Sequence, residues 1–276
     1  MQTVIFCGGE GTRISGSGPE KKELYQIGDR PILWHIMKIY DHFGHHDFIL
    51  CLGYKGELIR RFFFEYELNK GDVMLELSGR RTRQLREPTT MEDWRIILAD
   101  TGQTTQTGGR LARIRDYVEG DYFLMTYGDG LGDVNLDAVL EHHRRMGRIV
   151  TLTAVQAPSR FGDLGLSRGL VRTFREKART GQDWINGGFL VCDTRVFDYI
   201  TGDECVFETD VLERLVKEGQ VAAYPHMGSW QCMDTYRALE MLNELDRNGE
   251  AFWKVWETTE ISGGIGRRSS PVARAS

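Results

Sequence analysis

Apolar runs alternate with helix-like segments through the first half of the chain. Strands are expected at 2–7, 47–53, 94–99, 121–127 and 149–155, and helices near 31–43, 55–68, 108–118 and 135–147. Continuous apolar strands separated by helices are typical of a mostly parallel sheet that helices cover on both faces. The pattern therefore predicts an α/β fold whose ligands bind beyond the carboxyl ends of the strands.

The second half of the chain has a different pattern. Shorter strands are expected at 163–166, 170–176 and 185–192, and helices near 208–218 and 234–248. These segments predict a lobe attached to the α/β core, with the join near residue 155. Residues 261–276 are small, polar and weakly patterned, so we interpret them as a flexible tail after a single domain at 1–260.

The first apolar run ends in a glycine-rich segment, Gly8-Gly9-Glu10-Gly11-Thr12-Arg13. Glycines let backbone N–H groups approach a ligand closely and tolerate positive φ. Successive N–H groups in such a turn bind anions, and the Arg13 guanidinium can hold a phosphate through two hydrogen bonds. The segment predicts a nucleoside triphosphate site, although an ordinary glycine-rich turn after a strand has the same pattern.

The residues after this loop argue against the two best-known phosphate loops. No Gly-Lys-Ser or Gly-Lys-Thr sequence ends the loop, as a Walker loop requires. The glycines lead into Ile-Ser-Gly-Ser-Gly-Pro, which does not start a helix as the dinucleotide-binding fingerprint does. We therefore expect a long loop with Lys21 and Lys22 at its far end.

The amino-acid composition limits the kinds of molecule that the protein is expected to bind and the compartment in which it is expected to work. The 276 residues carry a formal net charge of −5, so no basic surface favours nucleic acid or an anionic membrane. No apolar stretch approaches the ~20 residues of a membrane span, and a core-like strand at the very start predicts that there is no signal peptide. The five scattered cysteines have no Cys-x-x-Cys spacing, which predicts reduced thiols in a cytoplasmic protein.

Two aspartates are candidate ligands for Mg²⁺. Asp129 follows an expected strand within Tyr127-Gly128-Asp129-Gly130, where a carboxylate can reach a cation that also binds triphosphate oxygens. A plain Asp-Gly turn is the structural alternative at this position. Asp234 is the second candidate, and the N-cap of the helix that follows is its alternative role.

Three further segments offer groups for a polar ligand. Asn186-Gly187 lies within an apolar run, where glycine indicates close approach by a ligand and the Asn186 amide suits sugar hydroxyls. Glu176 and Lys177 can hold a hydroxyl and a phosphate, or form a surface charge pair. Thr107-Gly108-Gly109-Arg110 opens an expected helix, whose free N–H groups favour an anion or the edge of a base.

Taken in order, these motifs resemble the sugar-1-phosphate nucleotidyltransferases. The matching segments are the glycine loop to Arg13, Lys22, Asp100-Thr-Gly, Thr107-Gly-Gly-Arg, Tyr127-Gly-Asp-Gly, Glu176-Lys177, Asn186-Gly-Gly-Phe, and Trp230-Gln with Met233-Asp234. Pro31-Ile-Leu-Trp-His-Ile-Met-Lys and Gly53-Tyr54-Lys55-Gly56 resemble the cytidylyl-transferring branch of that family. The resemblance extends to about residue 257.

The resemblance implies a Rossmann-like fold: a mixed, mostly parallel sheet flanked by helices, with a nucleotide-binding part at about 1–155 and a sugar-binding lobe at about 156–260. It implies a Mg²⁺-dependent in-line displacement in which CTP and α-D-glucose 1-phosphate give CDP-glucose and pyrophosphate. A sugar phosphate oxygen needs no general base, which agrees with the absence of a Ser-His-Asp or Cys-His arrangement. A homo-oligomer is also expected, with the aromatic helix at 61–66 either at a contact or in a core.

The resemblance also implies roles for particular residues. The triphosphate would be held by Gly8, Gly9, Gly11, Thr12 and Arg13. The cytidine would be lined by Thr107, Gly109 and Arg110, and Gly128 would also belong to the nucleotide site. The sugar and its phosphate would be met by Lys22, Tyr127, Glu176, Lys177, Asn186 and Gly187. Arg13, Lys22 and Asp129 would carry catalysis, and Asp129 and Asp234 would ligate Mg²⁺.

The chain departs from the family pattern in two places. The family usually has Lys-Pro-Lys-Pro after the glycine loop; here Glu20-Lys21-Lys22-Glu23 stands in a loop one residue shorter. Lys22 aligns with the second family lysine, Lys21 can replace it by slippage, and Glu20 adds a negative charge. Ala178 stands where the family has proline. A thymidylyl- or uridylyltransferase, another sugar 1-phosphate, and a catalytically weak sugar-nucleotide-binding subunit therefore stay open.

Overall fold

The computed structural model describes residues 1–9, 21–66, 72–76, 81–84, 92–156, 163–167, 170–175 and 184–257. Several predictions of site residues fall outside these ranges: Gly11, Thr12, Arg13, Glu20, Glu176, Lys177 and Ala178. The predicted tail at 261–276 lies outside them as well. The roles expected of these residues stay predictions.

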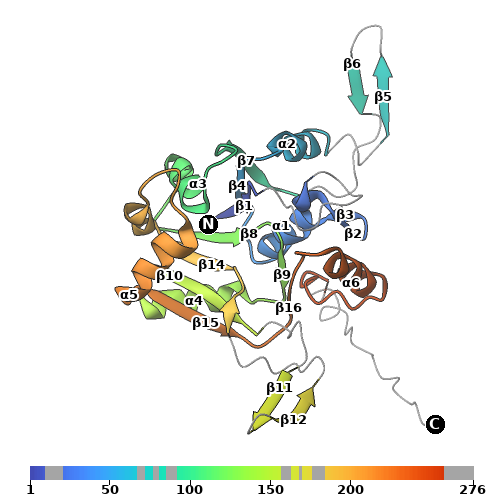
Figure 1. Cartoon of the computed structure of the whole chain (residues 1–276). Coiled ribbons are helices and arrows are strands. Elements are labelled where there is room, and N and C mark those ends of the chain that lie inside the picture. The colour runs from blue at the N-terminus through green and yellow to red at the C-terminus, as the bar shows by residue number, and fades with distance from the viewer. Residues whose placement is uncertain are drawn as a thin grey trace, which may run out of the picture.

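An eight-stranded sheet forms the centre of the molecule (Figure 1). Its order is β7 (Arg95–Asp100), β4 (Asp47–Leu52), β1 (Gln2–Cys7), β8 (Tyr122–Tyr127), β14 (Leu190–Asp193) with β13 (Ile185–Asn186), β10 (Val150–Val155) and β15 (Val221–His226). β13 and β14 run antiparallel to their neighbours, and the other neighbouring strands are parallel. The predicted fold class, an α/β fold with a mixed and mostly parallel sheet, is confirmed.

Small two-stranded sheets complete the described strands. They are β2 (Gln26–Ile27) with β3 (Arg30–Pro31), β5 (Val73–Glu76) with β6 (Arg81–Gln84), β9 (Gly130–Gly132) with β16 (Trp230–Cys232), and β11 (Asp163–Ser167) with β12 (Leu170–Arg175). In Figure 1 the β5–β6 and β11–β12 hairpins project from the body of the molecule. The β9–β16 pair joins the segment after β8 to the segment before α6.

Helices surround the sheet. The α-helices are α1 (Ile32–His42), α2 (Gly56–Phe64), α3 (Thr107–Arg113), α4 (Leu136–Met146), α5 (Glu213–Lys217) and α6 (Tyr236–Arg247). Three 3-10 helices, Lys22–Leu24, Arg115–Tyr117 and Thr194–Tyr199, and a π-helix, Phe207–Leu212, join them in the described chain. None of the helices in the described ranges is long and apolar enough to cross a membrane.

Apolar cores lie on both faces of the sheet. Successive residues of a strand point to opposite faces, and Ile5 of β1 packs in the core that α1, α4 and α6 cover. Its neighbour Phe6 packs in the other core, with residues of α3 and α5. The central strands are therefore buried on both sides, as their continuous apolar runs predict.

The structure corrects the expected elements at several ends. The strand expected at 185–192 is two strands, because Gly188 and Phe189 have positive φ values of 78° and 49° and interrupt the extended backbone. The helix expected at 55–68 ends at Phe64, and the helix expected at 108–118 is α3 followed by a 3-10 turn. Strands from after residue 155 belong to the central sheet, so the division into two parts at that residue stays a prediction.

Candidate active site at the carboxyl ends of the strands

Strand register brings four loops to one edge of the sheet. Cys7 of β1 lies opposite Leu52 of β4, which in turn lies opposite Asp100 of β7. On the other side of β1, Phe6 lies opposite Tyr127 of β8. Because these strands are parallel, the glycine loop and the loops after β4, β7 and β8 all leave the sheet at its carboxyl edge, where open α/β sheets bind their ligands.

The glycine loop begins against a buried arginine. Gly8 is buried, and a Cβ added to it would lie 2.2 Å from the guanidinium carbon of Arg110. A Cβ on Gly9 would meet no described residue within 4 Å. Neither residue is among the described glycines with positive φ. Glycine is required at position 8 because of the close approach of Arg110, and not because of left-handed backbone.

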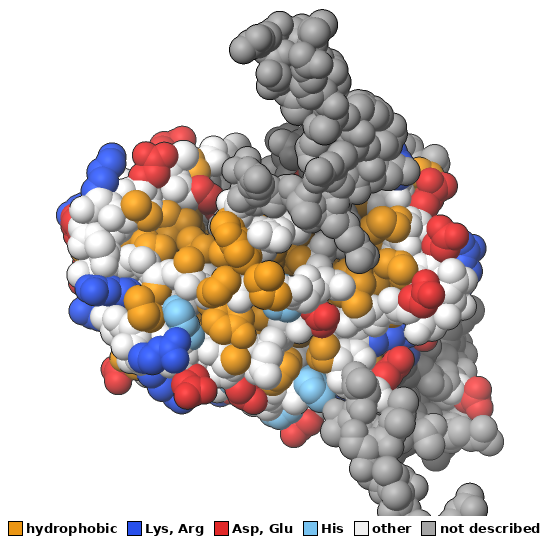
Figure 2. All heavy atoms as spheres, turned by 90° about the horizontal axis from the view of Figure 1, so that it is seen from below, with side chains coloured by type: hydrophobic (Ala, Val, Ile, Leu, Met, Phe, Trp, Pro, Cys, Tyr) orange, Lys and Arg blue, Asp and Glu red, His pale blue; other side chains and the backbone are white. Residues whose placement is uncertain are grey.

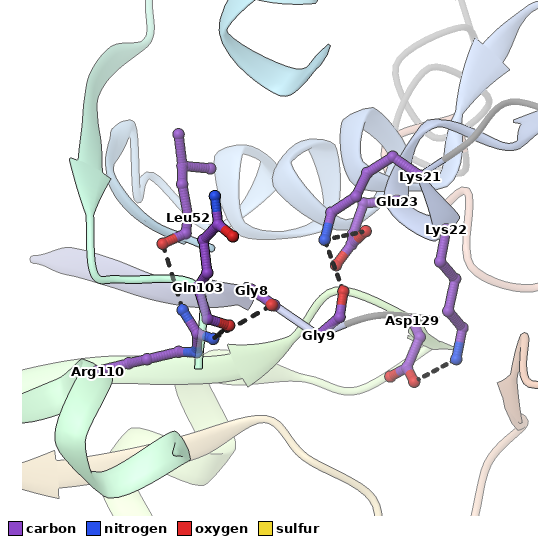
Figure 3. Close-up of polar contacts among 9 residues, drawn as sticks. All are labelled: Gly8, Gly9, Lys21, Lys22, Glu23, Leu52, Gln103, Arg110 and Asp129. Carbon is purple, nitrogen blue, oxygen red and sulfur yellow. Dashed lines mark hydrogen bonds and ion pairs between the residues drawn. The ribbon is translucent and has the colours of Figure 1, made fainter. Parts of the chain in front are cut away.

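The Arg110 side chain connects three of the strand-end loops (Figure 3). Its guanidinium donates to the Gly8 carbonyl after β1 at 3.2 Å and to the Leu52 carbonyl of β4 at 3.3 Å. It also donates to Thr101 Oγ1 at 2.9 Å and the Gly102 carbonyl at 2.7 Å, both after β7. Arg110 is only 5% exposed, and this burial lowers its pKa. A positive charge thus lies directly behind the glycine loop.

A second buried cation holds the next residue of the loop. Lys21 is 2% exposed, and its Nζ donates to the Gly9 carbonyl at 2.7 Å (Figure 3). Its ammonium lies 3.5 Å from Oε2 of the buried Glu23. Burial raises the pKa of Glu23 to about 7, and Lys21 and a backbone hydrogen bond offset part of that rise. Lys21 therefore supports the loop from behind.

Asp129 and Asp234 come together through a short antiparallel pairing. Asp129 lies in the turn between β8 and β9, and its carbonyl accepts from the Met233 amide at 2.8 Å. In the same pairing Gly130 of β9 lies opposite Cys232 of β16. The N-cap of α6 is Thr235, whose side chain accepts from the Ala238 amide, so the alternative capping role of Asp234 is wrong.

Lys22 lies between the two aspartates. Its Nζ donates to Asp129 Oδ2 at 2.8 Å and to Asp234 Oδ1 at 2.5 Å. Burial alone would lower the pKa of Lys22, but the two carboxylates more than compensate and raise it. Of the two adjacent lysines, Lys22 is therefore the one that faces the carboxylates, and Lys21 faces the loop backbone.

The aspartates suit a divalent cation. Oxygen atoms of Asp129 and Asp234 and the Cys232 sulfur all lie within 4.8 Å of one another. Mg²⁺ prefers oxygen ligands, and one or two protein carboxylates are enough when a triphosphate supplies the rest. The residues present therefore fit Mg²⁺, with the two carboxylates as its protein ligands.

A carboxylate that sequence reasoning missed connects the predicted base side with the predicted sugar side. Glu208, in the π-helix, accepts from Thr107 Oγ1 at 2.7 Å and from Tyr127 Oη at 2.6 Å. Burial and this carboxylate raise the pKa of Tyr127. The only sequence signal for Glu208 was an acidic residue in an expected helix. Single-turn π-helices often occur at functional sites, and this one positions its carboxylate between two candidate residues.

The start of α3 is already hydrogen-bonded within the protein. The amides of Gly108 and Gly109 donate to the Cys205 carbonyl at 2.9 and 3.2 Å. A Cβ on Gly109 would lie 2.5 Å from the Asp203 carbonyl oxygen. Close packing against residues 203–205 thus explains why glycine stands at these positions. Because both amides already donate within the protein, they do not provide the contact with a nucleotide that was predicted for Thr107, Gly109 and Arg110.

The predicted sugar-side residues Asn186 and Gly187 lie at the end of β13, and Gly128, predicted in the nucleotide site, follows β8. Asn186 is exposed, and its Oδ1 accepts from the Gly188 amide at 3.0 Å. Gly187 is buried, and its carbonyl accepts from Trp230 Nε1 at 2.8 Å. Gly128 is buried too, since a Cβ there would lie 2.7 Å from Glu23 Cγ. Their contacts with a substrate stay predictions.

The strand-end residues together define a class of site. A glycine loop, two buried cations behind it, and two carboxylates that share an ammonium form one edge that suits a polyphosphate and a divalent cation. A family model described as "Nucleotidyl transferase" matches residues 2–249. The chain belongs to this family of nucleotidyltransferase enzymes.

Individual relatives match over almost the whole chain. The probable glucose-1-phosphate cytidylyltransferase of Bacillus subtilis (strain 168) is 42% identical over 258 residues, which cover 93% of this chain and 100% of the relative. The glucose-1-phosphate cytidylyltransferase of Salmonella typhimurium is 42% identical over 259 residues, with the same coverage. HddC from Yersinia pseudotuberculosis, solved complexed with GMP-PN, has the same fold, with a TM-score of 0.64, 20% identity, and coverage of 88% of this chain and 98% of that one.

Proposed function

We propose that this enzyme transfers the cytidylyl group of CTP to α-D-glucose 1-phosphate. The observation that carries the choice of substrates is the 42% identity, over the full length of both relatives, to proteins named for this activity. The geometry agrees with it, because cations and carboxylates gather at the strand edge where a nucleoside triphosphate would bind.

The reaction exchanges one phosphorus–oxygen bond for another. A phosphate oxygen of the sugar phosphate forms a bond to the α-phosphorus of CTP, and the bond from that phosphorus to the bridging oxygen breaks. Pyrophosphate leaves with the electron pair, and CDP-glucose remains. The attacking oxygen is already anionic at neutral pH, so catalysis consists of positioning and neutralising two polyanions.

The described residues can supply both the positioning and the charge neutralisation that this reaction needs. The glycine loop would position the triphosphate with Lys21 and Arg110 behind it, where their buried charges attract phosphate. Lys22 would move from the aspartates toward the sugar phosphate or the α-phosphate as the substrates bind. We propose that Asp129 and Asp234 hold Mg²⁺, which when bound supplies positive charge and a template for the triphosphate oxygens.

Residues outside the described ranges complete the proposal. Arg13 would neutralise the leaving pyrophosphate, with Gly11 and Thr12 beside it, and Glu176 and Lys177 would meet the sugar phosphate. These assignments rest on the resemblance of their motifs. A cytoplasmic location is part of the same proposal, and it is supported by five free cysteines, four of them buried.

Pyrophosphate release tests the substrates. The purified chain is incubated with Mg²⁺ and glucose 1-phosphate, and CTP, UTP, dTTP, ATP and GTP are compared. Strong preference for CTP is the expected result. Preference for another nucleotide would keep the reaction class and overturn the base assignment. No release with any of the five would favour another sugar phosphate or a catalytically weak binding subunit.

We also propose a homo-oligomer. Apolar side chains gather over the middle of the face seen in Figure 2, and large exposed apolar patches on soluble proteins usually mark interaction sites. Exposed large apolar residues of the described chain include Phe64, Val216, Met227 and Tyr236. Chromatography with light scattering should give a mass that is a multiple of 31.6 kDa. A monomer mass at every concentration would contradict this proposal.

A further inference from the structure

The chain after α6 folds back over α1. Gly249 has a positive φ of 71°, and its amide donates to the Asp246 carbonyl at 3.1 Å, so the helix ends in a reversal of the chain. Residues 251–257, which we call the C-terminal strap, then pack against the core that contains α1. Trp253 of the strap is completely buried. The strap is therefore a short segment that a large buried side chain anchors in the core.

The anchoring tryptophan contacts a buried histidine of α1. Trp253 Nε1 donates to His35 Nδ1 at 3.2 Å, and His35 Nε2 donates to the Ile27 carbonyl at 2.9 Å. An indole nitrogen can only donate and a carbonyl can only accept, so His35 carries its proton on Nε2 and keeps Nδ1 free. His35 is only 1% exposed. The two partners therefore fix one neutral form of the imidazole inside the core.

We infer that the C-terminal strap is held by an acid-sensitive contact and leaves α1 when His35 takes up a second proton. That proton comes from solvent and binds to Nδ1, so the N–H groups of His35 and Trp253 then face each other where one hydrogen bond stood. An imidazolium is also enclosed in an apolar core, where an unpaired charge is strongly unfavourable. Release of the strap relieves both effects, because it separates the two donors and gives the imidazolium access to water.

The charged groups around His35 come from three elements. Burial has the largest effect on the pKa of His35 and lowers it, and the hydrogen bond to the Ile27 carbonyl raises it. Asp246 of α6 and Asp29, between β2 and β3, also raise this pKa, whereas Lys254 of the strap lowers it. Asp246 is already paired with Lys254, at 2.8 Å. Burial outweighs the two carboxylates, so the imidazole is neutral while the strap is in place.

Attachment of the strap should weaken as the pH falls. The pKa of His35 is lowered while the strap is in place, so the open state binds the proton more tightly than the closed state does. The contribution of His35 to closure is fully present above about pH 6.5, the ordinary histidine pKa, and is lost progressively as the pH falls below it. A short segment after the last described helix can open without unfolding the sheet, because local openings cost less than global unfolding.

Opening of the strap should affect the segment that precedes α1. Ile27, whose carbonyl His35 holds, lies in the short β2–β3 hairpin, and this hairpin follows the 3-10 turn Lys22–Leu24. Ile27 and Trp253 pack in the same apolar core. Release of Trp253 therefore removes packing from the segment that positions the Lys22 ammonium. An effect on catalysis rests on the proposed function, whereas release of the strap does not.

The test is fluorine NMR of the full-length chain with all six tryptophans replaced by fluorotryptophan, recorded from about pH 8 to about pH 5. Single Trp→Phe variants assign the signals. The resonances of Trp253 and of Trp256, whose ring lies 6.2 Å from that of His35, should move together toward the position of an exposed tryptophan. Their common midpoint should lie below about pH 6.5. The resonance of Trp230 and the far-ultraviolet circular dichroism should stay unchanged.

Two histidine variants identify the group that titrates. His35→Gln cannot take up a proton in this range, and its amide can donate to a carbonyl or accept from an indole. The strap signals of this variant should stay in place across the pH series. His45→Gln is the matched control, because His45 is a buried histidine whose pKa burial also lowers, and it lies near the amino group of Met1 and Asp137. This variant should behave like the wild type.

Three results would overturn the inference: strap signals of the wild type that stay in place down to about pH 5, a change of all six signals together with the circular dichroism, or the wild-type transition in His35→Gln. The first two use the wild-type chain only, so they hold even if His35→Gln folds poorly. The spectra are recorded without substrate, so failure of the cytidylyl assignment would not affect them. With an active enzyme, the reversible loss of rate over the same pH range should be smaller in His35→Gln than in the wild type.

Discussion

At the scale of single residues, the site depends on charges that lie where they would be unfavourable without their partners. Lys22 shares two carboxylates, and Arg110 is buried among carbonyl oxygens. A buried cation whose donors are satisfied is tolerated, and it attracts an anion more strongly than an exposed cation does because little water screens it. In the proposed function, the buried cations would attract phosphate and the Asp129 carboxylate would bind the metal.

Asp129→Asn tests the metal assignment. The amide has almost the same shape but lacks the negative charge, so Mg²⁺ and Lys22 both lose their main partner. We expect kcat to fall by roughly 100-fold or more, with a higher Mg²⁺ concentration needed for half-maximal rate. Steady-state rates across a Mg²⁺ series measure both. Asp137→Asn, on the exposed face of α4, is the control, and a wild-type Mg²⁺ profile for Asp129→Asn would remove the assignment.

The buried Glu23 should make stability depend on pH. Its pKa is raised from 4.5 to about 7 in the folded chain, so the folded state binds the proton more tightly than the unfolded state does. The contribution is fully present below pH 4.5 and is lost as the pH rises through about 7. Relative to Glu23→Gln, which cannot titrate, the wild type should lose on the order of 3 kcal/mol between about pH 5 and 8.

Urea unfolding at a series of pH values measures this difference. The wild type and Glu23→Gln are compared at each pH, so that the titration of all other groups cancels. A stability difference that stays constant across the series would show that the Glu23 carboxyl has an ordinary pKa. A wild type that gains stability relative to the variant as the pH rises would show a lowered pKa.

At the scale of elements, the strand-end loops are connected by side chains from other elements. Arg110 of α3 connects the loops after β1, β4 and β7. Glu208 of the π-helix connects α3 with the end of β8. The carboxyl edge of the sheet, where we propose that phosphate binds, therefore depends on contacts between elements as much as on its own loops.

Gly8 and Gly9 are neighbours in the glycine loop, but a side chain at position 8 would be tightly packed and one at position 9 would not. An alanine at position 8 would place its Cβ 2.2 Å from the Arg110 guanidinium, whereas an alanine at position 9 would meet none of the described residues within 4 Å. Gly8→Ala should cost roughly 1–3 kcal/mol of stability, as overpacking of buried positions does. Gly9→Ala should cost much less. Thermal or urea unfolding of both variants measures this difference in stability. Equal stabilities of Gly8→Ala and Gly9→Ala would contradict the described packing.

Glu208→Ala should disturb both sides of the site together. Thr107 and Tyr127 each lose the acceptor of a short hydrogen bond, and the misplacement should lower kcat/KM about 10- to 100-fold. Glu208→Gln retains one acceptor oxygen and should lie between the wild type and the alanine variant. Glu213→Gln, at an exposed position in α5, is the matched control. Wild-type kinetics for Glu208→Ala would show that the bridge has no functional role.

The elements that could be predicted from sequence share a simple signal. Strands β1, β4, β7, β8 and β10 are continuous apolar runs, and the structure begins and ends each within about one residue of the prediction. β15 was missed because alanines and Pro225 weaken its strand pattern, and its pairing with β10 supplies the missing stability. Phe189 has a positive φ and divides β13 from β14. An apolar sequence gives no signal for such a backbone conformation.

Site residues were predictable only where their motifs stand at strand ends. Asp129 and Asp234 were chosen from sequence, and a three-residue pairing brings them together. Glu208 was missed because its hydrogen-bond partners, Thr107 and Tyr127, are more than 80 residues away in the sequence. The direction of the Arg110 side chain, into the protein behind Gly8, also depends on packing that no local pattern encodes.

At the scale of the whole molecule, one continuous sheet holds both halves of the proposed reaction. Strands before residue 155 carry the glycine loop and Asp129. From after that residue, β14 pairs with both β8 and β10, and β13 pairs with β10, in the same sheet. Two apolar cores fix this sheet from both faces. The proposed triphosphate and sugar sites would therefore be attached to one sheet, which suits a reaction that depends on in-line positioning.

A crystal structure with Mn²⁺ and CTP would test the central claim most directly, because Mn²⁺ scatters anomalously and replaces Mg²⁺ at oxygen sites. The account predicts an anomalous peak between the carboxylates of Asp129 and Asp234. It also predicts that Lys22 moves away from them and that the triphosphate lies over Gly8 and Gly9. A metal peak elsewhere, or a triphosphate bound away from the carboxyl edge of β1 and β8, would contradict it.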